Sequence, residues 1–208
     1  MFYIVGLGNP GVEYDNTRHN TGRMILEVSR SKEGFSGWRE DVKLKSQIAE
    51  GKIGTQKVAL VMPDTFMNRS GQAVGQLKDL KAKIIGKGKE KRIELESLVL
   101  VHDDLDLPFG TFKISFNKSS GGHRGVESVI KAVGTEGFIR VRVGISPATP
   151  KGVAKKPHGE EAVNKFILAK FKPVELAEFK KMAKKVSEAL AMIVAEGREK
   201  AMGEFNKS

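Results

Sequence analysis

Three short segments of the chain are apolar at nearly every position: residues 2–5, 57–62 and 97–102. Strands covered on both faces of a parallel sheet show this continuous pattern, whereas half-exposed strands alternate between apolar and polar positions. A polar or glycine-rich stretch follows each segment directly. The pattern therefore predicts three buried strands that end in loops, with residues 97–102 as the central strand.

Other segments have the periods of half-exposed strands and of amphipathic helices. Strands are expected over residues 46–54, which would form a hairpin with 57–62, and over 112–116 and 139–145. Helices are expected over residues 17–31, 71–85, 125–133, 160–169 and 173–196. The alternation of strands and helices predicts an α/β fold, in which helices cover both faces of a mixed, mainly parallel sheet.

Two long connections separate these elements. Residues 86–92 are charged and contain glycine, which predicts a solvated linker. Residues 146–159 are rich in proline, glycine and lysine, and such a loop is typical of a lid over a site.

The length of 208 residues fits one domain, and 39% hydrophobic residues are enough to build its core. No apolar run approaches the ~18 residues of a membrane helix, and the chain opens on a strand instead of a signal segment, so we expect a cytoplasmic protein. The net charge of +11 favours a polyanionic partner such as RNA, although a lysine-rich solvated surface would give the same excess.

Cysteine is absent, which excludes disulfides and thiolate metal sites. The four histidines are scattered along the sequence without a recognisable ligand spacing. We therefore predict no metal.

Gly6, Gly8 and Gly11 match the G-x-G-x-x-G pattern of dinucleotide-binding proteins, and Glu27 follows at the expected distance. In those proteins, however, the helix starts within the glycines and binds a pyrophosphate with its first amides. Here Pro10 interrupts the motif and the helix is expected later. A nucleotide-dependent oxidoreductase is accordingly the third interpretation.

Three loops follow the buried strands: residues 8–20, 63–70 and 102–110. Ligands of open α/β sheets bind outside the carboxyl ends of the strands, where these loops are expected to meet. No G-x-S-x-G nucleophile motif is present, so an activated water is the better candidate nucleophile.

Four polar residues of these loops could carry that chemistry. A histidine at a helix start, His19, suits a neutral base, and Asp103 could fix its tautomer. Asn9 and Asn68 could orient a carbonyl and stabilise its oxyanion. Taken singly, each is more often a capping, turn or surface residue, and only their shared place at the sheet edge favours a site.

Five ordered motifs resemble those of bacterial-type peptidyl-tRNA hydrolases and together cover nearly the whole chain, residues 1–208. They are residues 5–11 with Tyr14, 17–20 and Gly22, then 63–71, 102–110, 121–125 and 140–145. The resemblance implies hydrolysis of the ester between a peptide and the 3′-terminal ribose of tRNA, which recycles tRNA from stalled translation. It also implies a monomer that uses no cofactor.

By position in these motifs, His19 would be the general base and Asp103 its orienting carboxylate. Asn9 and Asn68 would bind the peptide and carbonyl region. The resemblance places the remaining substrate-binding residues at Tyr14, Met67, His123 and Arg124. The family usually has asparagine where this chain has Arg124.

Arg142 matches a basic residue that grips a tRNA phosphate together with a lysine. That lysine falls on Ser115 here, so Lys113 or Lys118 would have to replace it. The segment 86–92 lengthens the chain relative to shorter members. The competing interpretation is a non-catalytic RNA-binding protein on the same fold, which ranks lower because the residues of the proposed base and its partners are all present.

Overall fold

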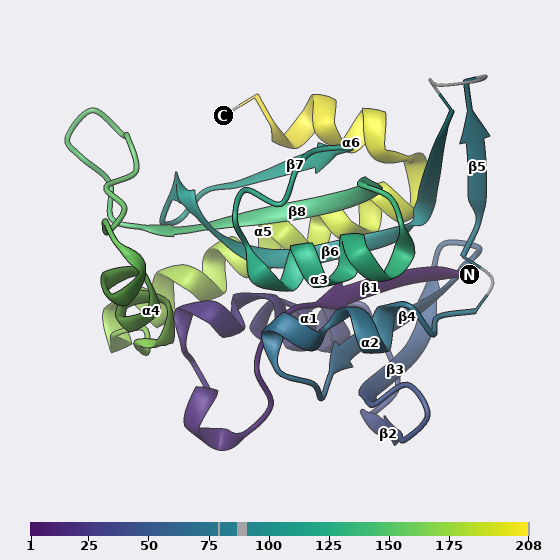
Figure 1. Ribbon diagram of the computed structural model, residues 1–208, viewed down its shortest axis with the longest axis horizontal. Helices are drawn as coiled ribbons and strands as arrows, with labels where there is room; N and C mark the ends of the chain where they lie inside the picture. The colour runs from purple at the N-terminus through teal and green to yellow at the C-terminus, as the bar shows by residue number, and fades with distance from the viewer. Residues whose placement is uncertain (79, 87–90, 208) are drawn as a thin grey trace.

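The computed structural model describes residues 1–78, 80–86 and 91–207. In this part of the chain, eight strands form one sheet with the order β2-β3-β4-β1-β6-β8-β7, and β5 pairs with β6 beside this path (Figure 1). The strands are β1 (Phe2–Gly6), β2 (Arg39–Asp41), β3 (Ser46–Ile53), β4 (Gln56–Pro63), β5 (Ala82–Ile85), β6 (Arg92–Pro108), β7 (Phe112–Phe116) and β8 (Gly137–Ser146). The helices are α1 (Thr21–Lys32), α2 (Gly71–Val74), α3 (Arg124–Val133), α4 (Glu160–Leu168), α5 (Pro173–Glu196) and α6 (Arg198–Phe205).

The central strands β4, β1, β6 and β8 are parallel, and antiparallel strands flank them. Helices cover both faces. Successive side chains of β6 point to opposite faces of the sheet. Val99 and Val101 pack against the layer of α1 and α5. Leu98 and Leu100 pack against the layer of α2 and α3. The mixed sheet with two helical layers and the single domain are confirmed.

Helix α1 begins four residues later than the sequence pattern predicts. A 3₁₀ turn, η2 (Arg18–Asn20), precedes it, so His19 does not lie in the first turn of the α-helix. The chain is held in this turn because the amide of Arg18 donates to the carbonyl oxygen of Ala169. The following helix then passes very close to the sheet, since a Cβ on Gly22 would lie 2.3 Å from the carbonyl oxygen of Val101.

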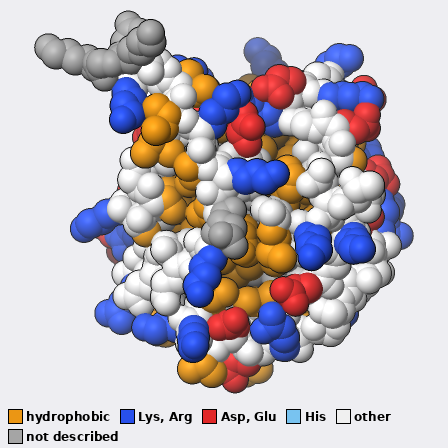
Figure 2. All heavy atoms as spheres, turned by 90° about the vertical axis from the view of Figure 1, so that its right-hand side faces the viewer, with side chains coloured by type: hydrophobic (Ala, Val, Ile, Leu, Met, Phe, Trp, Pro, Cys, Tyr) orange, Lys and Arg blue, Asp and Glu red, His pale blue; other side chains and the backbone are white. Residues whose placement is uncertain are grey.

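The predicted helix over residues 71–85 is wrong beyond its first turn in the described residues 75–78 and 80–85, and residue 79 lies outside the described part of the chain. Helix α2 ends at Val74, and Ala82–Ile85 forms β5 instead. Ile84 pairs with Ile93 of β6 in an antiparallel hairpin, where β-branched side chains fit well, and this tertiary pairing overrides the helical spacing. Of the expected linker 86–92, residues 87–90 lie outside the described residues. Figure 2 looks onto this end of the molecule, where lysine and arginine side chains surround hydrophobic ones.

The predicted loop 102–110 is also largely a strand. Strand β6 continues to Pro108 because it keeps pairing with β8, where Asp103 lies opposite Val143. Asp103 is therefore held by sheet hydrogen bonds and not by a loop. The expected hairpin and the strands, the long connection 146–159 and the two last predicted helices are found close to their expected bounds.

Helix α6, which the sequence pattern did not predict, lies against the edge strand β7. Just beyond it, the Asn206 side chain accepts a hydrogen bond from the Ile114 amide and donates one to the Ile114 carbonyl oxygen, each 2.9 Å long. The ring of Phe116 lies under the guanidinium of Arg198 at 3.4 Å. The end of the described chain thus covers this edge of the sheet.

Among the described residues, no helix combines the length and the apolarity that crossing a bilayer requires.

Candidate active site

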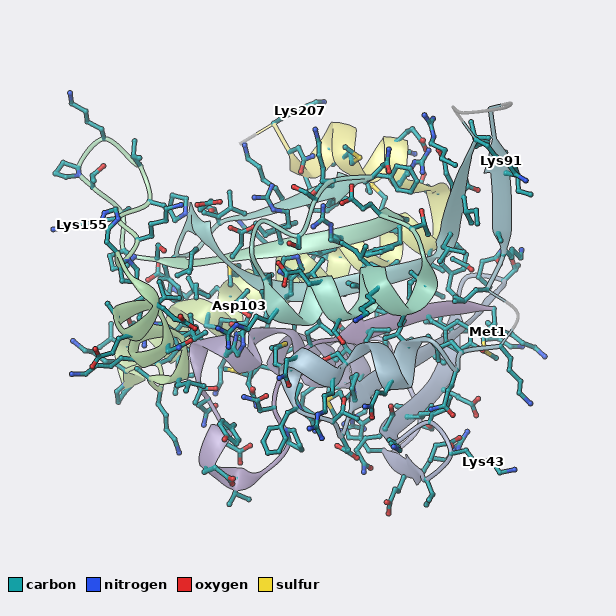
Figure 3. All side chains as sticks on the ribbon, in the orientation of Figure 1. Met1, Lys43, Lys91, Asp103, Lys155 and Lys207 are labelled. Carbon is teal, nitrogen blue, oxygen red and sulfur yellow. The ribbon has the colours of Figure 1, made fainter. Side chains whose placement is uncertain are left out.

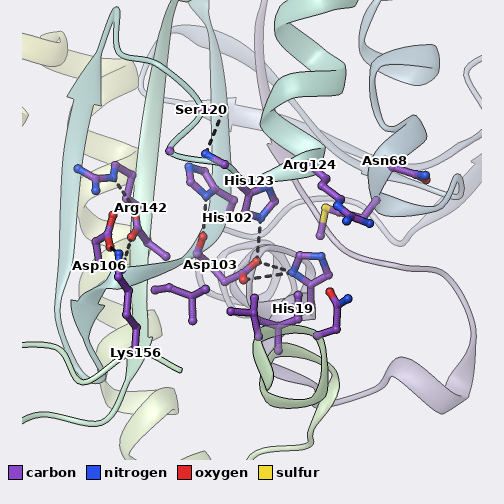
Figure 4. A pocket seen from close by; sticks show the side chains of 18 of the residues that line it. His19, Asn68, His102, Asp103, Asp106, Ser120, His123, Arg124, Arg142 and Lys156 are labelled. Atoms are coloured by element: carbon purple, nitrogen blue, oxygen red, sulfur yellow. Dashed lines mark hydrogen bonds and ion pairs between the residues drawn. The ribbon is translucent and has the colours of Figure 1, made fainter. Parts of the chain in front are cut away.

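A cavity of about 880 Å³ lies at the carboxyl end of the central strands. Figure 3 shows Asp103 at this end of the sheet and Met1 at the opposite end. Three of the four histidines line the cavity together with Asp103 (Figure 4). As expected from the sequence, His19 and Asp103 lie together at the carboxyl ends of the strands.

His19 and Asp103 are in direct contact. The Nδ1 atom of His19 lies 3.0 Å from Oδ1 and 3.1 Å from Oδ2 of the carboxylate, and both side chains are buried. An ionised carboxylate only accepts hydrogen bonds, so Nδ1 carries the proton of the neutral imidazole. The Nε2 atom of His19 then has the free lone pair of a base.

His123 holds Asp103 from a second side. Its Nδ1 accepts from the amides of Gly125 and Val126 at 3.2 and 3.3 Å, so it caps helix α3. Its proton must therefore be on Nε2, which donates to Oδ1 of Asp103 at 3.0 Å. One helix end thus fixes the tautomer of a histidine that orients the carboxylate.

The electrostatics of this group keep Asp103 ionised and His102 neutral. Burial by itself would raise the pKa of Asp103, but the attraction and hydrogen bonds of His19 and His123 outweigh it and hold this pKa well below its usual range. Burial lowers the pKa of His102 well below its ordinary value, and His123 lowers it further. The Nδ1 of His102 donates to the backbone carbonyl oxygen of Asp103 at 2.7 Å.

The two candidate asparagines occupy different places in the cavity. The Oδ1 of Asn9 accepts from the Met67 amide at 2.8 Å, which turns its amino group away from that backbone. Met67 is buried, and its sulfur packs tightly against Gly125. Asn68 is exposed in a 3₁₀ turn and lines the cavity on the side away from Asp103 (Figure 4).

Of the other predicted substrate contacts, Arg124 lines the cavity and Tyr14 does not. Arg124 forms an ion pair with Glu160 of α4 on the exposed surface. Tyr14 packs edge-on against the ring of Phe66, which does line the cavity.

Basic side chains occupy the β8 side of the cavity. The Nε of Arg142 donates to Asp104 at 2.6 Å, and Lys113 lies directly opposite Arg142 on β7. Residues directly opposite one another in an antiparallel pair project from the same face. Lys118 lines the cavity, whereas Lys113 is not among the lining residues.

Sequence reasoning gave no role to His102, Arg140 or Lys156, all of which line the cavity. Residues 139–145 alternate between apolar and polar positions, which places Arg140 on the same face of the strand as Arg142, and that signal could have included Arg140. Lys156 lies in the long loop after β8 and reaches Asp106 at 2.5 Å, a pairing that no sequence pattern predicts.

The histidines that look scattered in the sequence converge in space. Each of His19, Asp103 and His123 offers one atom that could bind a metal ion, and these three atoms lie within 4.8 Å of one another. The helix cap argues against such use, because a metal on Nε2 of His123 would compete with the proton that the cap places there. The absence of a metal stays a prediction.

The family model for peptidyl-tRNA hydrolase matches residues 3–208. A peptidyl-tRNA hydrolase of Herpetosiphon aurantiacus is 40% identical over 209 residues, which cover 99% of this chain and 90% of the relative. One of Carboxydothermus hydrogenoformans is 38% identical over 208 residues and covers 100% and 99% of the two chains.

Solved structures agree with the sequence comparisons. The crystal structure of peptidyl-tRNA hydrolase from Acinetobacter baumannii superposes with a TM-score of 0.83 at 28% identity, and the alignment covers 100% of this chain and 95% of that one. The chain therefore belongs to the peptidyl-tRNA hydrolase family.

Proposed function

We propose that the protein hydrolyses the ester that joins a peptide to the 3′-terminal ribose of tRNA. One observation carries this proposal: His19, oriented by a buried ionised Asp103, lines a cavity that also contains cationic side chains. An ester has a good leaving group, so a single positioned base with an oxyanion donor is enough chemistry for its hydrolysis.

His19 acts as the general base. Its Nε2 takes a proton from water while the water oxygen attacks the ester carbonyl carbon. The tetrahedral intermediate then expels the ribose oxygen, which receives the proton from His19, and the peptide leaves as a carboxylic acid that ionises. Asp103 stabilises the transient imidazolium, and His123 keeps Asp103 in place.

The peptide and carbonyl region is bound by Asn9 and Asn68, with Met67 and His123 along the wall of the same channel. The fixed Oδ1 of Asn9 supports this role, because its amino group remains available as a donor. Arg124 contacts the 3′ end of the tRNA once it releases Glu160. Tyr14 contributes by supporting Phe66.

The tRNA phosphates are bound by Arg142, with Lys113 or Lys118 in place of the missing lysine. The position of Lys113 opposite Arg142 and the place of Lys118 at the cavity support this assignment. Affinity for tRNA should fall with salt, and Arg142→Gln should lower the log–log slope by about 0.7–0.9. An unchanged slope in filter binding would contradict the assignment.

The proposed setting is that of a cytoplasmic monomer that needs no cofactor and no metal. The single domain contains the entire proposed catalytic group, which supports a monomeric enzyme. Light scattering of the purified protein tests the monomer, and unchanged activity after treatment with a chelator tests the independence from metal.

Release of peptide from N-acetyl-aminoacyl-tRNA tests the function. The wild type should release it, and His19→Ala should lose nearly all turnover while binding tRNA normally. The exposed His158, replaced by alanine, is the matched control and should retain full activity. If the wild type binds tRNA without releasing peptide, the chain is an RNA-binding protein on this fold.

A further inference from the structure

Arg18, which directly precedes His19, is a buried arginine that the proposed mechanism does not use. It is 7% exposed. Its Nη2 lies 2.9 and 3.0 Å from the two carboxylate oxygens of Glu175 in the first turn of α5. Its Nη1 donates to the carbonyl oxygens of Ala169 and Lys170, at 3.2 Å each. One side chain thus binds both the connection between α4 and α5 and the start of α5.

Two aromatic rings lie against the same guanidinium. Its central carbon is 4.7 Å from the ring centroid of Phe166 in α4 and 5.1 Å from that of Phe171, which precedes α5. A guanidinium at this distance from an aromatic face is attracted to it, and more strongly where water is excluded. Arg18 therefore holds the end of α4 and the start of α5 together around its charge.

The backbone beside Arg18 is attached to the same segment. The amide of Arg18 donates to the Ala169 carbonyl oxygen at 3.1 Å, and the residue before Arg18 forms an antiparallel bridge within residues 169–171. His19 follows at once in η2, and among the described residues its ring has a hydrogen-bond contact only with Asp103. The position of the His19 ring therefore depends on a turn that is fastened to residues 169–171.

Helix α4 is also a wall of the cavity that contains His19. It lies beside the purple N-terminal segment in Figure 1 and contacts η2. Four of its side chains line the cavity: Val163, Asn164, Ile167 and Leu168. Arg18 is not among the described residues that line it. Arg18 thus joins the base and this wall from outside the cavity.

We propose that Arg18 is a positioning residue for the reaction, which sets the place of His19 relative to Asp103 and to the α4 wall. This rests on the proposed function. A substrate seated against α4 then meets Nε2 of His19 at a fixed distance, and a displacement of about 1 Å in such a contact can lower the rate about 10²-fold. Arg18 neither contacts the substrate nor moves a proton.

Arg18→Lys tests the proposal in the release of peptide from N-acetyl-aminoacyl-tRNA. The variant keeps the positive charge, but one ammonium group cannot reach the Glu175 carboxylate and both carbonyl oxygens at once. We expect kcat to fall about tenfold, with KM within about twofold, because the substrate contacts are intact. An unchanged kcat would overturn the proposal.

The tautomer of His19 separates positioning from a general loss of structure. Two-bond proton–nitrogen correlation spectra of isotope-labelled protein report which imidazole nitrogen carries the proton, and the chain has four histidines to resolve. We expect the proton on Nδ1 of His19 in the wild type. Folded Arg18→Lys should show both tautomers, because the ring is no longer held against Asp103. The wild-type tautomer in this variant would overturn the proposal.

Arg198→Lys is the matched control. Arg198 also lies over a phenylalanine ring and pairs with an acid, Glu94, but it begins α6 and is not a described residue of the cavity lining. This variant should lower the temperature of unfolding and leave kcat and the His19 spectrum unchanged. An equal loss of kcat in both arginine variants would show that general destabilisation is the cause, which would refute the positioning role.

Glu175→Gln tests the link from its other end. Glutamine keeps an acceptor for the Lys172 amide, which Glu175 binds at 2.6 Å, but it loses the charge that attracts Arg18. We expect kcat to fall about threefold, and the double variant with Arg18→Lys should lose no more than Arg18→Lys alone, because both changes break one interaction. Losses that multiply in the double variant would contradict the link.

Failure of the proposed function remains distinguishable. If the wild type releases no peptide, the hydrolase assignment fails, and the spectra of His19 still test the position of its ring. A tautomer mixture in Arg18→Lys and not in Arg198→Lys would then support the positioning role, and wild-type spectra of both variants would refute it.

Discussion

Replacing Asp103 with asparagine should lower kcat sharply by changing the tautomer of His19. The helix cap fixes the proton of His123 on Nε2, so the amide oxygen of the new side chain must face His123. Its amino group then faces Nδ1 of His19, at the position where Oδ2 now lies 3.1 Å away. Nδ1 must accept that hydrogen bond, which moves the proton to Nε2 and removes the lone pair that would activate water.

The expected size of the effect follows from the hydrogen bond that Nδ1 of His19 donates to Asp103, one N–H shared by the two carboxylate oxygens. A charge-assisted hydrogen bond contributes about 1.5–3 kcal/mol, so its loss costs about that much in the transition state. This is a fall of roughly 10- to 10²-fold in kcat. KM should change little, because Asp103 is 3% exposed and contacts the histidines instead of the substrate.

Single-turnover release of peptide from N-acetyl-aminoacyl-tRNA measures this fall directly. Asp106→Asn is the control, because its carboxylate pairs with the exposed Lys156 and not with a histidine. Thermal unfolding of Asp103→Asn establishes that the variant is folded. A folded Asp103→Asn enzyme that kept more than a tenth of the wild-type kcat would refute the tautomer argument.

Three further predictions concern the surroundings of this group. His123→Asn keeps a helix cap, but its side chain is too short to reach Asp103. We expect kcat to fall at least tenfold while the unfolding free energy changes by less than about 1 kcal/mol. An unchanged kcat would show that His123 does not contribute to catalysis. The second prediction concerns His102, which stays neutral in the folded protein and is protonated in the unfolded chain below about pH 6.5. Because only the unfolded chain takes up this proton, the free energy of unfolding should fall by up to about 1.4 kcal/mol per pH unit as the pH drops below that value. Urea titrations from pH 7 to 5 should show a shallower fall for His102→Gln, and an identical fall would contradict the buried neutral state. Gly22→Ala should lower stability by about 1–3 kcal/mol in the same titrations, since its Cβ would collide with the Val101 carbonyl, and wild-type stability would disprove that close approach.

The sequence predicts the sheet well because its central strands are apolar on both faces and their ends carry polar residues. It fails over the described residues 75–78 and 80–85, since Ile84 and Ile85 suit a helix face and a strand pair equally, and only the pairing with Ile93 decides. It fails over α6 because that short helix is held by contacts with β7 and has little periodicity of its own.

Part of the candidate site could likewise be predicted from the sequence, and part of it could not. His19 and Asp103 could be brought together from the sequence, because parallel strands share one carboxyl edge. The role of His123 as a clamp on Asp103 could not, since it depends on a ring whose two nitrogens face a helix end and a carboxylate at once.

The amide of Asn206 occupies both hydrogen-bonding groups of Ile114, which lies at the middle of the outermost strand β7. An exposed edge of this kind is a template for another extended chain, and its pairing leads to aggregation or domain exchange. At other sheet edges, charged residues or a bulge prevent such pairing, and here the side chain of Asn206 prevents it. Any extended peptide that adds to β7 must first displace that amide, so this border of the sheet is closed to nascent or misfolded neighbours.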